Sequence, residues 1–271
     1  MSSTPDLAGR RFVVTGSASG IGAATVERLL TAEAEVYSLD RNQPRADVTR
    51  RVAKHIAVDL TDQASIDAAI KELPGGHLDG LLNIAGVPGT APGEAVFSVN
   101  ALAVRHLSEA LLDRLSPGGS IVIVGSTAGF GWPARLCAIK ELLSTDSYAE
   151  GLEWFRDNAP AGNAYNFSKE VTTVYAHMMG LGLNESGVRI NAVLPGPVET
   201  PILPDFEESI GKEVLDGVRD LLGRHATPDD IAKVIVFLAS DDAGWVNGQA
   251  LAVDGGISGA LTTGLFPAPE I

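Results

Sequence analysis

The sequence predicts an α/β fold, in which a single domain forms a doubly wound parallel sheet of the Rossmann type. Short apolar runs alternate with helical patterns along the 271 residues. Most of these runs are continuously apolar, as is typical of parallel strands that are buried on both faces. The first run leads through a glycine-rich turn into a helix, the start of a dinucleotide-binding unit. We find no internal repeat and no linker, so residues 1–271 are expected to form one domain.

The expected elements follow the chain in order. Short apolar runs predict the strands Phe12–Thr15, Val36–Asp40, His55–Asp59, Leu81–Ala85, Ile121–Gly125, Arg189–Leu194 and Leu251–Val253. Helical spacing of apolar residues predicts helices at Ile21–Leu30, Ala64–Leu73, Ala101–Leu115, Asn166–Leu183 and Asp229–Ala239. Thr227 and Pro228 precede the last helix and suit its N-cap and first turn.

A glycine-rich turn follows the first expected strand. Its glycines are Gly16, Gly20 and Gly22, and Ser19 and Ile21 flank Gly20. Gly16 permits the tight turn, Gly20 lets the backbone approach a pyrophosphate, and Gly22 lets the helix lie close to the strand. The helix N-terminus offers unpaired N–H groups and a partial positive charge to phosphates. The spacing G-x3-G-x-G differs from the commonest fingerprint, and a glycine turn without function is the alternative.

Asp40 ends the second expected strand, 18 residues after Gly22. An acidic residue near this position would hydrogen-bond the adenosine ribose of a dinucleotide. A carboxylate would also repel a 2′-phosphate, so the expected cofactor is NAD rather than NADP. Arg41 follows directly and leaves NADP open, and the alternative for Asp40 is a turn residue at a strand end.

Tyr165 and Lys169 stand four residues apart in an expected helix, and Ser126 follows an apolar run upstream. Residues four apart share one helix face, so the lysine ammonium can lie beside the phenol. That charge would lower the pKa of Tyr165 from its usual value of about 10. The phenol could then exchange a proton with an alcohol or a carbonyl, while Ser126 holds the substrate oxygen. Chance spacing on an amphipathic helix is the alternative.

Further candidate site residues lie at or just after the ends of the expected strands. Asp59 ends the third strand, Asn83–Gly86 overlaps the end of the fourth, and Pro195–Pro197 follows the sixth. Ligands of open parallel sheets bind beyond the carboxyl ends of the strands. The sequence therefore predicts one site at that edge of the sheet.

Composition argues against several other classes. The formal net charge of −14 disfavours nucleic acid as a partner, because phosphate backbones require clustered Lys and Arg. No apolar run reaches the ~18 residues of a membrane span, and residues 1–10 lack the apolar stretch of a secretory signal. The single cysteine, Cys137, fits a reducing cytoplasm. The histidines are scattered without ligand spacing, so no metal is expected.

With these residues, the chain resembles the short-chain dehydrogenase/reductase family over nearly its whole length. The matching motifs are Thr15-Gly16-x3-Gly20-x-Gly22, Asn83-x-Ala85-Gly86, Asn100, Ser126, Tyr165-x3-Lys169 and Pro195-Gly196 with Thr200. Together, and in this order along the chain, they are specific for the family. The resemblance implies an NAD(P)-dependent alcohol dehydrogenase or carbonyl reductase. It also implies a homo-oligomer, a dimer or a tetramer.

The resemblance implies roles for individual residues. Tyr165 would be the acid/base, and Lys169 would lower its pKa and hold the nicotinamide ribose. Ser126 would orient the substrate oxygen, and Asn100 would maintain a proton-relay water. The other implied roles are contacts to the cofactor, and the full cofactor set is Gly16, Ser19, Gly20, Ile21, Gly22, Asp40, Asp59, Leu60, Asn83, Ala85, Gly86, Tyr165, Lys169, Pro195, Gly196, Val198 and Thr200.

Two departures from the family pattern narrow the expected class of substrate. Asn83 and Asn100 are only 17 residues apart, so the helix between them is expected to be much reduced. Ser126 and Tyr165 are 39 apart, which leaves an insert at about residues 130–162. Members of the coniferyl-alcohol and 3α-hydroxysteroid types are similar in both respects. The substrate is therefore expected to be a hydrophobic, ring-bearing alcohol or its carbonyl.

The insert leaves the sheet beside Ser126 and returns beside Tyr165, so it is expected to pass near the substrate. Its large apolar side chains could form a wall for a ring-bearing substrate. The alternative is that they pack the insert onto the body. The insert could also cover helices through which many family members dimerise. These side chains are Trp132, Leu136, Leu142, Leu143, Tyr148, Trp154 and Phe155.

Three other segments have expected roles. Residues 205–222 mix charged and apolar residues and suit a mobile lid over the nicotinamide, with a fixed surface helix pair as the alternative. The tail Gly259–Ile271 would wrap a surface or a partner subunit, or fray. His106 and His177 are expected to be structural, because no carboxylate or cysteine partner is near them in sequence.

We therefore expect reversible hydride transfer between NAD and a hydrophobic alcohol or its carbonyl, in the cytoplasm. The cofactor would supply the hydride chemistry, and the protein would supply position and pKa. The alternative from another class is a catalytically silent NAD-binding redox sensor or scaffold, which the presence of Tyr165, Lys169 and Ser126 disfavours. An enoyl reductase is also disfavoured, because that branch of the family spaces its Tyr and Lys more widely.

Overall fold

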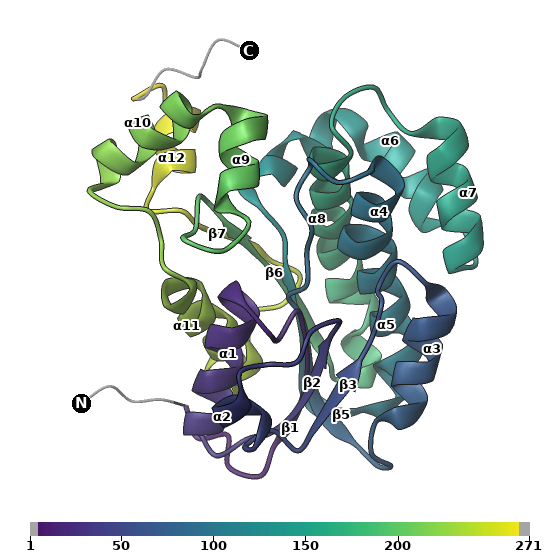
Figure 1. Cartoon of the computed structure of the whole chain (residues 1–271). Helices are drawn as coiled ribbons and strands as arrows, with labels where there is room; N and C mark the ends of the chain where they lie inside the picture. The colour runs from purple at the N-terminus through teal and green to yellow at the C-terminus, as the bar shows by residue number, and fades with distance from the viewer. Residues whose placement is uncertain (1–4, 266–271) are drawn as a thin grey trace.

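The computed structural model describes residues 5–265 and confirms the doubly wound α/β fold (Figure 1). One sheet contains the seven strands of this part of the chain in the order β3-β2-β1-β4-β5-β6-β7, and every neighbouring pair is parallel. The strands are β1 (Arg11–Thr15), β2 (Glu35–Asp40), β3 (Lys54–Ala57), β4 (Leu78–Asn83), β5 (Leu115–Val124), β6 (Arg189–Pro195) and β7 (Ala250–Val253).

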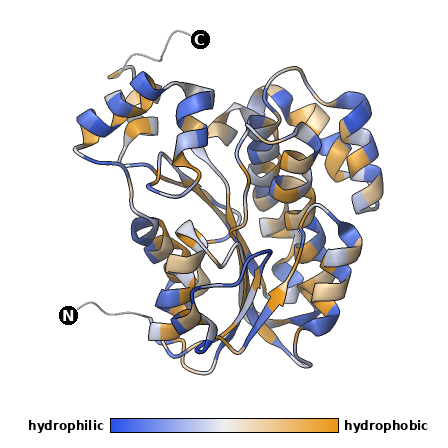
Figure 2. Ribbon diagram, in the orientation of Figure 1, coloured by the Kyte–Doolittle hydropathy of each residue, from blue (hydrophilic) through white to orange (hydrophobic). Residues whose placement is uncertain are grey.

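Helices cover both faces of this sheet. The strands are apolar along most of their length (Figure 2). Each face of the sheet buries its own hydrophobic cluster. Burial on both faces explains the continuous apolar runs in the sequence. The helices on one face are α1 (Gly20–Thr31), α2 (Ala46–Thr49) and α11 (Pro228–Ala239), and those on the other are α3 (Gln63–Glu72), α5 (Ala103–Leu111) and α8 (Ala164–Gly182).

The direction of winding reverses between β1 and β4, which are neighbours in the middle of the sheet. The loops that follow these two strands diverge and open a crevice at the carboxyl edge. Thr15, at the end of β1, braces this point. Its hydroxyl oxygen accepts hydrogen bonds from the backbone N–H groups of Ile84 (2.9 Å) and Ala85 (3.1 Å).

Local sequence signals explain where several helices begin. Thr227 caps α11 in a reciprocal capping box with Asp230, and Pro228 occupies the first helical position, as predicted. The side chain of Asn163 caps α8 by accepting a hydrogen bond from the N–H of Tyr165. That cap places the start of α8 immediately before the predicted catalytic tyrosine.

The chain between Asn83 and Asn100 is short, and its helix is reduced to the turn α4 (Gly93–Phe97), as expected. The helix expected at Ala101–Leu115 is less regular than predicted. A π-helical turn at Ser98–Leu102 precedes α5, and a 3-10 turn at Leu112–Arg114 follows it. The π-helical turn contains Asn100, and such turns are frequent at functional sites.

The insert forms two helices that the sequence patterns did not predict, α6 (Trp132–Leu143) and α7 (Tyr148–Asn158). Phe155 stacks on Phe97 with 4.0 Å between the ring centroids, and Trp154 lies near-parallel to Phe167 at 6.1 Å. The hydroxyl of Tyr148 donates a hydrogen bond to the carbonyl of Thr61 at 3.2 Å. These aromatic side chains therefore pack the insert onto the body of the protein.

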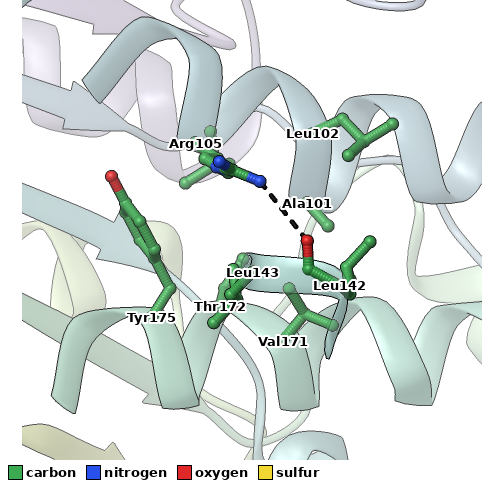
Figure 3. A pocket seen from close by; sticks show the side chains of 9 residues that line it. Ala101, Leu102, Arg105, Leu142, Leu143, Val171, Thr172 and Tyr175 are labelled. Atoms are coloured by element: carbon green, nitrogen blue, oxygen red, sulfur yellow. Dashed lines mark hydrogen bonds between the residues drawn. The ribbon is translucent and has the colours of Figure 1, made fainter. Parts of the chain in front are cut away.

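Arg105 of α5 anchors the far end of α6. Its guanidinium donates hydrogen bonds to the carbonyl of Leu142 (3.4 Å) and to the hydroxyl of Thr145 (3.0 Å), and Figure 3 shows the first of these. A cation at a helix C-terminus pairs with carbonyls that lack partners within the helix. The cavity beside these residues has a volume of about 10 Å³, room for one water molecule at most, so it is not a ligand site.

The helices α9 (Leu203–Ile210), α10 (Lys212–Leu222) and α12 (Ile257–Thr262) gather beyond the carboxyl ends of the strands (Figure 1). The segment expected to be a lid is thus a helix pair, joined at Gly211. The tail Gly259–Ile271 was expected to wrap a surface or a partner subunit, or to fray. It begins inside α12, and its residues 266–271 lie outside the described residues. Three 3-10 turns complete the elements of the described residues, and they are Thr127–Gly131, Asn184–Ser186 and Asp241–Ala243.

His106 has a carboxylate partner that the sequence analysis did not find. Its Nε2 lies 2.7 Å from Oδ1 of Asp67, which is 39 residues away along the chain. The two side chains meet because α3 packs against α5. His177 donates from Nδ1 to the carbonyl of Gly248 at 2.8 Å. Both histidines therefore have structural partners.

Candidate active site

One large cavity lies at the carboxyl edge of the sheet, with a volume of about 1340 Å³. Small-molecule sites usually measure ~300–1,000 Å³, so this cavity has room for a dinucleotide and a substrate beside it. It brings together most of the predicted site residues, namely Gly16, Ser19, Gly20, Ile21, Gly22, Asp40, Asp59, Leu60, Ala85, Gly86, Ser126, Tyr165, Lys169, Pro195, Gly196, Val198 and Thr200.

The glycine-rich turn has the geometry of a phosphate-binding loop. Gly16 has a φ of +66° and lies so close to the loop after β4 that a Cβ would come 2.7 Å from Cα of Ala85. Ser19 precedes α1 without forming a side-chain cap, and the first turn of α1 contains no acidic residue. The N–H groups of that turn can therefore bind an anion.

Asp40 lines the cavity at the end of β2. Its Oδ2 accepts a hydrogen bond from the N–H of Ala18 (3.0 Å), and its Oδ1 accepts one from the N–H of Asn42 (2.9 Å). These bonds hold the carboxylate beside the glycine-rich turn. Arg41 lines the cavity as well and is exposed. Both a carboxylate and a cation are thus present at this end of the cavity.

Asp59 lines the cavity just after β3. Its carboxylate accepts hydrogen bonds from the N–H (2.9 Å) and the hydroxyl (2.7 Å) of Thr61. Hydrogen bonds to the charged form lower the pKa of Asp59, so it is ionised at neutral pH.

Thr200, after β6, lies against the glycine-rich turn. A Cβ on Gly20 would come 3.2 Å from Cγ2 of Thr200.

Ser126, Tyr165 and Lys169 meet because the end of β5 and the start of α8 lie together. Ser126 caps the turn Thr127–Gly131, and its hydroxyl oxygen accepts a hydrogen bond from the N–H of Ala128 at 3.2 Å. Lys169 is buried, and its Nζ donates a hydrogen bond to the carbonyl of Val124 at 2.8 Å. The same Nζ lies 5.6 Å from the centroid of the Tyr165 ring.

Burial dominates the protonation of both groups. Desolvation raises the pKa of Tyr165 to about 12, against an opposing effect of the hydrogen bond with Ser126. It also lowers the pKa of Lys169 to about 8. The expectation that the lysine charge gives Tyr165 a lowered pKa is therefore wrong for this structure, because desolvation raises the pKa and only the hydrogen bond with Ser126 opposes it. Tyr165 holds its proton at neutral pH and can donate it to a carbonyl oxygen.

Asn83 and Asn100 do not line the cavity. The buried amide of Asn83 donates a hydrogen bond to the hydroxyl of Ser108 at 3.1 Å, and its contact with the cofactor stays a prediction. Asn100 accepts from the N–H of Val87 (2.9 Å) and donates to its carbonyl (3.0 Å). Its side chain thereby holds the loop after Gly86, and its role in a proton relay stays a prediction.

The far half of the cavity has a lining that the sequence analysis missed. Phe206 of α9 meets the Tyr165 ring edge to face. Ile257 and Leu261 of α12 line the same region at a spacing of four, which is a helical signal that could have found them. They escaped notice because the sequence analysis expected no helix after residue 239.

The insert contributes only Phe130, its first residue, to this lining. The expected apolar wall from its other large side chains is wrong, because they are turned toward α8 and the chain before α5. The helices α9, α10 and α12 supply the apolar surface instead. A helical insert buries its aromatic side chains on the nearest hydrophobic face, here the face formed by α8.

Within residues 5–265, no group of three or more His, Cys, Asp or Glu side chains is arranged to hold a metal ion. No helix in the same range has the length and apolar character to cross a membrane.

A phenol, a hydroxyl and an ammonium group beside a dinucleotide-sized cavity can move protons to and from an alcohol or a carbonyl. Fold and site together define a nucleotide-dependent oxidoreductase. A model of the short chain dehydrogenase family matches residues 10–138, and a model described as enoyl-(acyl carrier protein) reductase matches residues 154–258. The chain belongs to the short-chain dehydrogenase/reductase family.

Individual relatives cover almost the whole chain. It is 40% identical to the coniferyl-alcohol dehydrogenase of Pseudomonas sp. strain HR199, over 93% of this chain and 98% of that enzyme. It is 31% identical to the 3-alpha-hydroxysteroid dehydrogenase/carbonyl reductase of Comamonas testosteroni, over 92% and 97%. The crystal structure of a 3-alpha-hydroxysteroid dehydrogenase from Pseudomonas sp. B-0831, complexed with NADH, matches with a TM-score of 0.78, 34% identity and coverage of 94% and 99%.

Proposed function

We propose that this protein transfers hydride reversibly between NAD and a hydrophobic, ring-bearing alcohol or its carbonyl. The distribution of charge in the cavity carries the proposal. The charged side chains among the described lining residues are Asp40, Arg41, Asp59 and Lys169. The lining around the far side of Tyr165 is neutral and largely apolar, with Phe130, Phe206, Val214, Leu215, Val218, Ile257 and Leu261. Such a surface favours an uncharged substrate with ring-sized apolar area.

The relatives support the same substrate class. One is named for coniferyl alcohol and two for 3-alpha-hydroxysteroids, and all of these compounds are ring-bearing alcohols. They differ in size and shape, from one aromatic ring to a fused ring system. The cavity is large enough for either in addition to a dinucleotide, so the proposal names the class of alcohol.

NAD is the proposed cofactor, and it would supply the hydride acceptor and donor when bound. The first turn of α1 would hold the pyrophosphate, and Asp40 would accept a hydrogen bond from the adenosine ribose. Leu60 would flank the adenine beside Asp59. Lys169 would hold the nicotinamide ribose, and Val198 and Thr200 would meet the carboxamide. The relative complexed with NADH supports this assignment.

The proton steps belong to three side chains. During oxidation, the hydroxyl of Ser126 orients the substrate oxygen. The phenol of Tyr165 must first release its own proton, and its phenolic oxygen then accepts the substrate hydroxyl proton. During reduction, Tyr165 donates its proton to the carbonyl oxygen. Asn100 would support the water that reloads this proton.

Assembly into a homo-oligomer, a dimer or a tetramer, and a cytoplasmic location are also part of the proposal. Large apolar side chains at the surface support self-association: Trp245 is 100% exposed and Leu181 is 83% exposed. α6 packs over α8, which disfavours assembly through that helix. Sedimentation equilibrium would measure the subunit count. The single cysteine favours a reducing compartment.

A turnover screen tests the function. Purified protein is mixed with NAD or NADP and with coniferyl alcohol, 3α-hydroxysteroids, small aliphatic alcohols and anionic alcohols, and formation of reduced nucleotide is followed by absorbance. We expect turnover with NAD and at least one ring-bearing neutral alcohol. Preference for anionic alcohols would contradict the substrate class. Binding of NAD without turnover across the whole panel would favour a silent redox sensor or scaffold.

A further inference from the structure

Glu170 follows Lys169 on α8, and its side chain is only 4% exposed. A buried carboxylate needs a partner for its charge. Arg135 of α6 provides one, with Nη1 lying 3.3 Å from Oε1 and 3.2 Å from Oε2. Burial raises the pKa of Glu170, and the guanidinium acts in the opposite direction. The pair joins the insert directly to the catalytic helix.

The turn that begins at Ser126 lies against the same part of α8. A Cβ on Gly131 would come 2.5 Å from Oε1 of Glu170, and a Cβ on Gly129 would come 2.7 Å from the carbonyl oxygen of Lys169. Neither position has room for a side chain, so the turn rests directly on the helix. The position of Ser126 relative to Tyr165 depends on this contact.

Arg135 also reaches the segment that enters α8. Its Nη2 donates to the carbonyl of Ala161 at 3.5 Å, two residues before Asn163. Asn163 in turn accepts a hydrogen bond from the N–H of Tyr165 at 2.8 Å. One guanidinium therefore contacts the side chain after Lys169 and the backbone that leads to Tyr165, while its own helix continues the turn from Ser126.

We propose that Arg135 and Glu170 are positioning residues, and that their ion pair holds the Ser126 turn in register with Tyr165 and Lys169. This deepens the proposed oxidoreductase function and rests on it. The insert has other anchors, because Arg105 holds the end of α6 and Phe155 stacks on Phe97. Loss of the pair therefore displaces the turn without releasing the insert.

The kinetic test compares Arg135→Ala, Arg135→Lys and Glu170→Gln with the wild type. Even a small displacement of a reacting group lowers the rate of the chemical step strongly. We therefore expect kcat to fall on the order of 10- to 100-fold in Arg135→Ala and Glu170→Gln. The Kd of NAD stays within about twofold, because the turn of α1 is untouched. Arg135→Lys restores part of kcat. If Arg135→Ala fails to fold, Glu170→Gln, which keeps the side-chain shape, decides.

Arg156→Ala is the matched control. Arg156 of α7 pairs with Glu94 of α4 at 2.8 Å, so it also joins the insert to the body, but both side chains are 53% exposed. An exposed ion pair contributes little to stability, so the kcat of Arg156→Ala should match that of the wild type. An equal loss of kcat in this control would assign the effect to general loosening of the insert and overturn the proposal.

Hydrogen exchange separates this inference from the proposed function. Backbone exchange of Thr127–Gly131 should be at least several-fold faster in Arg135→Ala and Glu170→Gln than in the wild type and Arg156→Ala. If the wild type turns over no alcohol, the proposed function fails. The hydrogen-exchange rates then decide by themselves whether the ion pair positions the turn. Unchanged exchange, or an unchanged kcat in an active enzyme, shows that Arg135 and Glu170 do not position the turn.

Discussion

Phe206 meets Tyr165 edge to face, with 5.2 Å between the ring centroids and an angle of 68° between the ring planes. Close by, the hydroxyl of Thr90 donates a hydrogen bond to the carboxylate of Asp205 at 2.7 Å, which ties α9 to the loop after β4. The helix pair expected as a lid therefore lies over the phenol. This contact makes α9 part of the proposed substrate site.

Phe206→Ala should reduce kcat/KM for a ring-bearing alcohol roughly 10- to 100-fold, because burial of one Phe side chain contributes about 1.5–3 kcal/mol. A small aliphatic alcohol, which cannot reach α9, should lose less. Steady-state kinetics with both alcohols measure the difference. Phe237→Ala, on the outer side of α11 and 40% exposed, is the control and should leave both values unchanged. Equal losses for the two alcohols would show that Phe206 does not select rings.

Tyr165→Phe should lower kcat on the order of 10²- to 10⁴-fold, the usual contribution of a general acid or base. The Kd of NAD should stay close to that of the wild type, because the ring remains in place. Tyr175→Phe, on the same helix but outside the large cavity, is the control. Near-normal turnover by Tyr165→Phe would rule out this phenol as the proton donor and acceptor.

Because Lys169 is buried, we expect the free energy of unfolding to depend on pH. Burial holds the pKa of Lys169 at about 8 in the folded protein, below its ordinary value of 10.5. The unfolded chain therefore binds more protons between these two values, and the free energy of unfolding rises with pH across that window. Lys169→Met should lack this rise, which is on the order of 3 kcal/mol. Urea unfolding at several pH values, without added nucleotide, checks it, and parallel curves for both proteins would contradict it.

Asp40→Ala should weaken NAD and reduce the discrimination against NADP. The carboxylate would no longer accept the ribose hydrogen bond or repel a 2′-phosphate, and Arg41 would remain beside the site. The ratio of kcat/KM values for the two nucleotides should fall on the order of tenfold or more. An unchanged ratio would reject this account of Asp40.

Phe155→Ala tests the finding that the insert's aromatic side chains belong to the core. Phe155 is 7% exposed and stacks on Phe97. Its truncation should lower the free energy of unfolding by about 3–5 kcal/mol. The KM of the alcohol should stay unchanged in the protein that remains folded. A raised KM with unchanged stability would instead place Phe155 in the substrate wall.

Predictions from sequence succeeded where neighbours along the chain carry the signal. Thr227 and Pro228 were sufficient to locate the start of α11, because capping depends on adjacent residues. Buried strands were readable because seven parallel segments share the same apolar character on both faces. The spacing of Tyr165 and Lys169 already implied one helix face.

The predictions failed where a residue's role depends on distant partners. The hydrogen bond between Asn83 and Ser108 of α5 joins residues 25 positions apart, and no local pattern predicted it. The large side chains of the insert suited a substrate wall as well as a core, and only their packing against Phe97 and Phe167 distinguishes these possibilities. The α12 residues Ile257 and Leu261 have a helical spacing, but only the tertiary fold places that helix at the cavity.

By itself, the sequence determined the family, the parallel sheet, the glycine-rich turn and the choice of Ser126, Tyr165 and Lys169, which the fold brings together. These follow from motifs and periodicities of residues close together in the chain. The tertiary structure alone decided the far wall of the cavity, the Arg135–Glu170 contact and the raised pKa of Tyr165. The physical reason is that desolvation and side-chain packing depend on which remote segments fold against one another.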